Sequence, residues 1–87
     1  MYNNELKKLL DKKDPEKHLR NFALKLFEQQ MNKKEIYSIF FGYYQSILEI
    51  KEEQANADKL GDVMDMISGD FVGKNIDFNL EKYDPYL

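Results

Sequence analysis

The residues best suited to recognise a ligand are carboxylates spaced along one predicted helix. Asp58, Asp62 and Asp65 follow one another at intervals of four and three residues, which places them within about 60° on one helix face. Such a row is a solvated surface, a landing patch for a cationic protein, or a source of oxygen ligands for a divalent metal ion. Neighbouring acidic residues extend it, so the predicted partner-binding set is Glu52, Glu53, Asp58, Asp62, Asp65 and Asp70.

The spacing of these carboxylates does not match a known metal-binding loop. An EF-hand needs alternating oxygen ligands and a central glycine, and the stretch from Asp62 to Asp70 has neither. The chain has no cysteine and one histidine, His18, so it offers neither a Cys-based zinc site nor a pair of imidazoles. We therefore expect no metal ion and no cofactor.

Sequence motifs for catalysis are also missing. There is no phosphate-binding G-x-x-x-x-G-K-[ST] loop, no H-E-x-x-H and no G-x-S-x-G. Ser38, Ser46 and Ser68 are the only serines, and none has a histidine nearby in the sequence. His18 has no evident partner to orient it as a base, so we expect it to be structural or solvent-facing. The sequence therefore predicts a protein that is not an enzyme, with no catalytic residue to assign.

The element around which the rest of the chain is organised is a long helix predicted over residues 33–54. Asn32 is a suitable N-cap, and Glu35 stands three residues later, where a capping box requires it. Met31 and Ile36 occupy the two positions of a hydrophobic staple. Three independent signals thus place the start of this helix at the same boundary.

The apolar residues of this helix form two stripes, whereas an ordinary surface helix has one. The first stripe is typical of a core-facing surface and consists of Ile36, Ile39, Phe40, Tyr43, Ile47 and Ile50. The second predicts packing on a further side, either within the fold or against a partner. Together with a ridge of small residues it gives a candidate self-association surface: Tyr37, Phe41, Gly42, Tyr44 and Leu48.

Further helices are predicted over residues 3–12, 15–30 and 57–68. Their expected N-caps are Asn3 or Asn4, then Asp14 followed by Pro15, then Asn56 or Asp58, and Gly69 is expected to end the last helix. The tail, residues 71–87, contains alternating apolar residues and aromatics, and it either docks on the bundle or adds a strand to a partner's sheet. The prediction is an all-α, four-helix bundle in one domain, 1–87, with the third helix central and an ordered C-terminal tail.

Charge is distributed unevenly along the 87 residues. Residues 1–34 carry nine Lys or Arg and five Asp or Glu, whereas residues 35–87 carry four Lys and eleven Asp or Glu. Twelve of the thirteen basic residues are lysine, which is poorer than arginine at bidentate recognition of phosphates and bases, so we expect no nucleic-acid partner. The only arginine, Arg20, is expected to pair with a C-terminal carboxylate. No apolar run approaches membrane-spanning length and the N-terminus does not resemble a signal peptide, so we expect no membrane partner and a cytoplasmic protein.

Three stretches suggest a relationship to known proteins: Leu19-Arg20-Asn21-Phe22-Ala23-Leu24, Asn32-Lys33-Lys34-Glu35-Ile36-Tyr37 and Gly61-Asp62-Val63-Met64-Asp65-Met66-Ile67-Ser68-Gly69. Their layout resembles that of small, all-helical bacterial proteins of unknown function, some of which are similar to immunity proteins paired with toxins. The resemblance spans most of residues 15–70. It implies a stoichiometric inhibitor that covers a basic toxin surface with its own acidic surface.

Two functions follow as hypotheses. The first is a non-catalytic protein-binding module, in its specific form an immunity-type inhibitor, which presents the acidic C-terminal half to a basic protein partner. The second is a homodimeric helical structural module that associates through the aromatic surface of the third helix. The sequence leaves open the partner's identity, the oligomeric state and the biological process.

Overall fold

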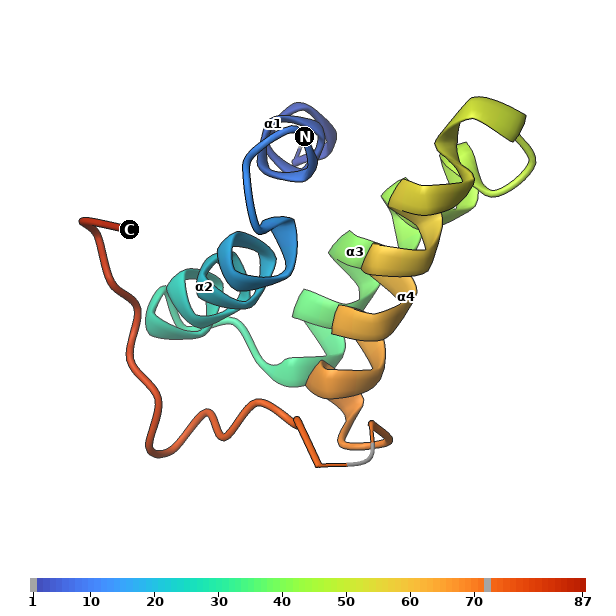
Figure 1. Ribbon diagram of the computed structural model, residues 1–87. Coiled ribbons are helices and arrows are strands. Elements are labelled where there is room, and N and C mark those ends of the chain that lie inside the picture. The colour runs from blue at the N-terminus through green and yellow to red at the C-terminus, as the bar shows by residue number, and fades with distance from the viewer. Residues whose placement is uncertain (1, 72) are drawn as a thin grey trace.

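A computed structural model describes residues 2–71 and 73–87, and within them it contains four α-helices and no strand. The all-α prediction is therefore confirmed. The elements are shown in Figure 1 and are α1 (Asn3–Leu10), α2 (Pro15–Glu28), α3 (Lys33–Ile47), the short 3₁₀ turn η1 (Lys51–Glu53) and α4 (Gln54–Ser68).

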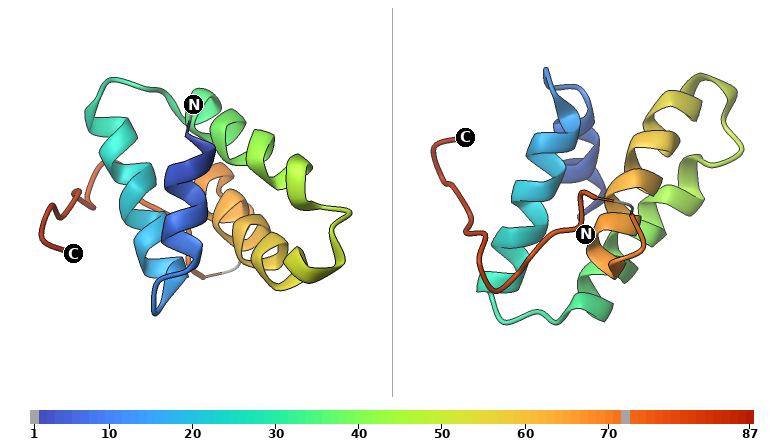
Figure 2. Two further views of the ribbon diagram at one scale, coloured as in Figure 1. Left: turned by 90° about the horizontal axis from the view of Figure 1, so that it is seen from above. Right: turned by 60° about the horizontal axis from the view of Figure 1, so that its bottom comes forward.

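The helices form two pairs that pack against each other. Helices α3 and α4 lie side by side as an antiparallel hairpin and make the most extensive contacts in the molecule. Helix α1 lies above the space between α2 and this hairpin, as Figure 1 and the left view of Figure 2 show. Helix α2 contacts the three other helices, and so does α3. The third helix is central as predicted, and it shares that position with α2.

Phe40 of α3 is fully buried near the centre of the core. Its ring lies 6.2 Å from that of Phe22, which in turn lies 5.9 Å from that of Tyr2, so aromatic contacts link α3 to α2 and to the start of α1. Burying a side chain of this size contributes about 1.5–3 kcal/mol. The rest of the core comes from every helix and from the tail: Leu6, Leu10, Leu19, Ala23, Leu24, Leu26, Ile36, Tyr43, Ile47, Ala57, Leu60, Val63, Met64, Met66, Ile67, Ile76 and Phe78.

The start of α3 has the predicted capping box. The Asn32 side-chain oxygen accepts a hydrogen bond from the Glu35 backbone N–H at 2.8 Å, and the Asn32 N–H donates to the Glu35 carboxylate at 3.1 Å. Two backbone donors that the helix cannot satisfy internally are thus satisfied. The capping box thus defines where the connection from α2 ends and α3 begins.

The predicted end of the third helix is wrong. We expected one helix over 33–54, but α3 ends at Ile47 and the chain reverses before α4 begins at Gln54. The side chain of Gln54 donates to the carbonyls of Leu48 and Ile50, at 2.7 and 3.2 Å, and so satisfies acceptors freed by the break. The reversal lets α4 bury its apolar face against α3, and tertiary packing of this kind outweighs local helix preference.

Several smaller boundaries also differ from the prediction. Helix α1 ends at Leu10 and α2 at Glu28, each two residues early, and α4 starts three residues before the predicted 57. Tyr2 occupies the N-cap position of α1 in place of Asn3 or Asn4, and neither Asn56 nor Asp58 caps α4 because both lie inside it. Asp14 does precede Pro15 at the start of α2, but it has a left-handed φ of 56° and makes no side-chain cap.

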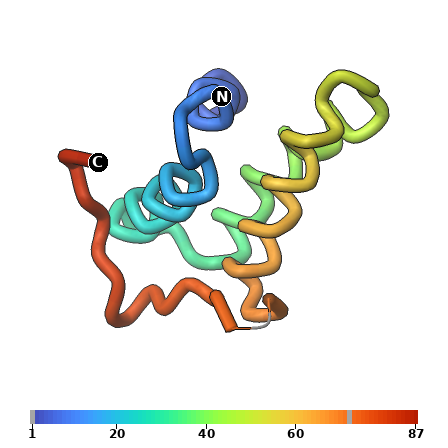
Figure 3. Tube along the Cα trace, in the orientation of Figure 1, coloured from blue at the N-terminus to red at the C-terminus, as the bar shows by residue number. Residues whose placement is uncertain are grey.

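The C-terminal tail packs on its own bundle, along α2 (Figure 3). Gly69 ends α4 with a φ of 90°, as predicted, and the chain then turns back. The Ile76 N–H donates to the Met66 carbonyl at 3.0 Å, and Ile76 and Phe78 are buried. Further along, Asn21 pairs with the backbone of Asp84 through two hydrogen bonds of 2.9 and 2.8 Å. The tail is thus an integral layer of the fold.

Candidate partner-binding groove

A groove runs between the outer sides of α3 and α4, and we call it the α3–α4 groove. It encloses about 390 Å³ and is open to solvent along its length. One wall comes from α3 and the other from α4, so the groove exists only because the two helices form a hairpin. Its lining residues are Tyr37, Phe41, Tyr44, Ala57, Asp58, Gly61, Asp62, Met64 and Asp65.

The α3 wall of the groove is aromatic. The rings of Tyr37 and Phe41 are 6.3 Å apart and those of Phe41 and Tyr44 are 6.4 Å apart, each pair inclined by 21°. Intervals of four and three residues place the rings on one helix face, and their spacing lies within the attractive range for aromatic pairs. Phe41 is 40% exposed, whereas Tyr37 and Tyr44 are half-buried. The second apolar stripe is therefore only partly covered, by α4.

The α4 wall is acidic. Asp58, Asp62 and Asp65 are all exposed, as the sequence predicts. Among the residues that the structure describes, none of the three forms an ion pair, since the single salt bridge joins Arg20 to Glu81 at 2.7 Å. That bridge confirms the prediction that Arg20 pairs with a C-terminal carboxylate. The carboxylates of the groove are therefore not neutralised within the described chain.

Gly61 lies on the α4 side of the groove, next to the Tyr44 ring. A Cβ atom built at Gly61 would lie 3.8 Å from Cε1 of Tyr44, an ordinary van der Waals contact. The small residue therefore leaves room beside the ring, and a larger side chain at this position would enter the groove. A larger uncharged residue at position 61 would therefore fill the groove without changing its charge.

The other predicted partner-binding residues lie outside the groove lining. Glu52 is exposed in η1, and the half-buried Glu53 accepts a hydrogen bond from the Asn56 amide at 2.9 Å. Asp70 lies beyond the opposite end of α4 and accepts from the Ser68 hydroxyl at 3.0 Å. These residues flank α4 at its two ends. The structure therefore gathers three of the six predicted carboxylates into one site.

The predicted self-association residues are divided in a similar way. Tyr37, Phe41 and Tyr44 line the groove, but Leu48 stands at the C-cap of α3 and is 42% exposed. Gly42 is exposed, and a Cβ atom built there would meet nothing within 4 Å. The sequence treats the aromatic and acidic surfaces as alternatives, whereas the structure makes them facing walls of one groove. Ala57, Gly61 and Met64 are additional lining residues that were not predicted to bind a partner.

Within residues 2–71 and 73–87, no cluster of three or more acidic or histidine side chains is placed to hold a metal ion. His18 lies in a separate hollow beside α1 and the tail, away from the α3–α4 groove. Tyr43 of α3 faces the core, and burial raises the pKa of its hydroxyl, with smaller contributions from the negative charges of Glu53 and Asp11.

Comparisons of the chain with protein-family models, with curated proteins and with solved structures found no match. Among the helices of the described residues, none has the length and apolar character needed to cross a membrane.

Proposed function

We propose that the protein is a non-catalytic binding module that holds a basic protein partner in the α3–α4 groove. The observation that carries this proposal is the pairing of an aromatic wall with an acidic wall that has no ion-pair partners in the described chain. Ring faces attract ammonium and guanidinium groups, and carboxylates bind the same groups through charge-assisted hydrogen bonds. A lysine or arginine side chain would be favoured by both walls at once.

The apolar part of the groove indicates which residue types would neighbour the lysine or arginine of the partner. Phe41 and the edge of Tyr44 remain available to an apolar side chain, because α4 covers only one flank of the aromatic row. A segment that alternates basic and apolar residues on one face therefore fits better than a purely basic one. The excess negative charge of residues 35–87 would also steer a cationic protein toward this side and raise its association rate.

The specific form of this function that we favour is an immunity-type inhibitor. It rests on the resemblance of the sequence to small helical immunity proteins and on the acidic groove. Such an inhibitor acts by occupying a basic surface of its target in one-to-one proportion. It needs no catalytic group.

The test is to isolate a partner and to compare its affinity for matched variants. Proteins captured from the source cells by the immobilised chain are identified, and a purified candidate is then titrated calorimetrically. The charge-reversed pair Asp58→Lys with Asp62→Lys should weaken binding roughly ten-fold or more, and added salt should weaken wild-type binding. Asp11→Lys with Glu49→Lys makes the same charge change at exposed positions outside the groove and should have little effect. If both double variants lose the same affinity, the partner responds only to the overall charge of the protein. If the Asp58 and Asp62 variant loses no affinity, the groove is not the binding site.

A groove-filling variant separates the shape of the site from its charge. Gly61→Leu leaves all carboxylates in place but projects a side chain beside Tyr44. If the partner inserts side chains into the groove, this variant should bind at least as poorly as the charge-reversed pair. Undiminished affinity would show that the partner contacts only the acidic rim.

A homodimer is the second candidate function, and the exposure of Phe41 and Leu48 favours it. Phe41 lies on α3 and Leu48 at its C-cap, so a two-fold axis near this helix could cover them with their own copies. Sedimentation of the wild type and of Phe41→Asp would reveal such a dimer as a change from dimer to monomer. A wild type that is monomeric at every concentration would remove this alternative.

A further inference from the structure

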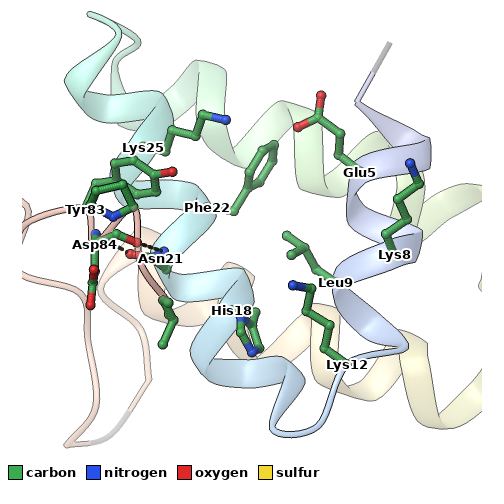
Figure 4. Close-up of a pocket in the computed structure, with 12 residues that line it drawn as sticks. Glu5, Lys8, Leu9, Lys12, His18, Asn21, Phe22, Lys25, Tyr83 and Asp84 are labelled. Atoms are coloured by element: carbon green, nitrogen blue, oxygen red, sulfur yellow. Dashed lines mark hydrogen bonds between the residues drawn. The ribbon is translucent and has the colours of Figure 1, made fainter.

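A second hollow lies between α1, α2 and the tail, and we call it the α1–α2 cavity (Figure 4). It is open to solvent on one side and has a volume of about 260 Å³, slightly below the range of pockets for drug-sized ligands. Phe22 of α2 and Leu9 of α1 form an apolar surface in its middle, and Tyr83 and Pro85 of the tail form one side. It shares no lining residue with the α3–α4 groove.

At one end of this cavity Lys12 supplies a positive charge and the His18 ring supplies an N–H donor. The side chains of Lys12 and His18 face each other across it, below the apolar surface in the view of Figure 4. In the part of the chain that the structure describes, Lys12 forms no ion pair and the His18 ring makes no hydrogen bond. At the other end Glu5 lines the cavity together with Lys8 and Lys25, whereas Figure 4 shows Lys12 apart from both acidic lining residues, Glu5 and Asp84.

The remaining acidic residue of the lining, Asp84, does not neutralise that end. Its Oδ1 atom accepts a hydrogen bond from the Tyr86 N–H at 2.9 Å, within the turn of the tail. Figure 4 shows it beside Asn21, on the tail side of the cavity. A ligand with a negative group would therefore meet the positive charge of Lys12 and an N–H donor of His18 at this end.

The tail wall of the cavity is held in place by contacts with α2. The Asn21 amide donates to the Asp84 carbonyl at 2.9 Å and accepts from the Asp84 N–H at 2.8 Å, as a neighbouring strand would. The Tyr83 N–H donates to the Glu28 carboxylate at 2.9 Å, and the Lys25 ammonium lies 5.9 Å from the centre of the Tyr83 ring. The wall is thus formed before any ligand arrives, which lowers the entropic cost of binding.

We infer that the α1–α2 cavity binds a small aryl carboxylate. The carboxylate lies between Lys12 and His18, and the ring lies against Phe22 and Leu9, in reach of Tyr83. A single ring with a short acidic arm suits the small volume. The apolar middle and the one charged end together explain why neither a bare anion nor a neutral ring would satisfy the site.

Three probe molecules test the inference: one has both a carboxylate and an aromatic ring, one has only the ring, and one has only the carboxylate. We expect 3-phenylpropionate to bind saturably in roughly the millimolar range that its size allows. Neutral 3-phenylpropan-1-ol and ring-free acetate should each bind at least roughly five-fold more weakly. Binding is followed by NMR through the ring protons of His18, which is the only histidine and gives an unambiguous signal. Failure of 3-phenylpropionate to saturate the shift, or equal binding of the alcohol, would overturn the inference.

Matched variants locate the binding site. Lys12→Gln should weaken 3-phenylpropionate binding roughly five-fold, whereas Lys13→Gln, an exposed neighbour that does not line the cavity, should leave it unchanged. Leu9→Phe adds a ring inside the cavity without changing charge and should abolish saturable binding. Thermal melts confirm that each variant is folded. Equal affinities of the Lys12 and Lys13 variants, or tight binding by Leu9→Phe, would contradict the assignment.

Discussion

Tyr43 shows how one residue in this fold links structure to pH. Its side chain lies in the core-facing stripe of α3, and burial raises the pKa of its hydroxyl above the ordinary value of 10.0. The negative charges of Glu53 and Asp11 act in the same direction. The neutral hydroxyl is therefore the form that the folded state favours.

This shift predicts a loss of stability at alkaline pH. Above about pH 10 the unfolded chain ionises at Tyr43 while the folded chain still holds the proton, so the free energy of unfolding falls as the pH rises toward the folded pKa. Below that range both states keep the proton and the residue adds no pH dependence. Urea unfolding measured across this alkaline range should show a shallower fall for Tyr43→Phe than for the wild type.

The matched control for this experiment is Tyr86→Phe, because Tyr86 is 95% exposed. Its pH profile should follow that of the wild type. Equal slopes for the wild type and Tyr43→Phe would show that the alkaline transition has another origin.

Among the helices, the α3–α4 corner is where sequence reasoning failed, and the cause is specific. The apolar period of α3 continues through Ile47 to Ile50, and the corner contains no glycine or proline to mark a stop. The acceptors freed at the corner are satisfied by the side chain of Gln54, which is a good helix former by itself. By contrast, the capping box at Asn32 and the αL glycine at 69 are local signals, and both were predicted correctly.

The same corner explains what could be predicted about the candidate groove. The aromatic row and the acidic row follow from intervals of three and four residues within single helices, so the sequence revealed each row. The two rows face each other only because the chain reverses after Ile47. The predicted single helix over 33–54 leaves no place for that reversal. The sequence therefore identified six of the nine lining residues as candidates for binding but placed them on two separate surfaces.

The role of Gln54 can be tested directly. Gln54→Ala removes both side-chain hydrogen bonds to the corner carbonyls and should lower the free energy of unfolding by about 0.5–1.5 kcal/mol. Gln45→Ala changes an exposed position of α3 in the same way and should have almost no effect. Denaturant unfolding of the two variants provides the comparison. A Gln54 variant as stable as the wild type would mean that water replaces these hydrogen bonds without loss.

On the scale of the whole molecule, the tail contributes to the core as a helix would. Phe78 is 4% exposed, and its ring lies 4.9 Å from that of Phe27 on α2. The Lys33 ammonium lies 5.7 Å from the centre of the Phe78 ring, so the tail also contacts the start of α3. A small chain buries a limited fraction of its surface, which makes each such contact a large share of the total stability.

Removing this contact should be costly. Phe78→Ala is expected to lower the free energy of unfolding by about 3 kcal/mol, from lost burial and the cavity left behind. Leu80→Ala, two residues away and 78% exposed, should change it by less than about 0.5 kcal/mol. Chemical denaturation curves for both variants test this contrast. Similar small effects at the two positions would show that the tail is not part of the cooperative unit.

Arg20 joins three segments that are distant in the sequence. Its guanidinium donates to the Lys74 carbonyl and to the Glu81 carboxylate, both at 2.7 Å, and to the Met66 sulfur at 3.2 Å. If the tail detached gradually from either end, some of these Arg20 donors would lose their acceptors beside the core, and an unsatisfied donor there has a high free-energy cost. We therefore expect the last segment of the chain to detach in a single step. A protease would then meet this segment either docked on the bundle or fully released, with few partly digested forms between.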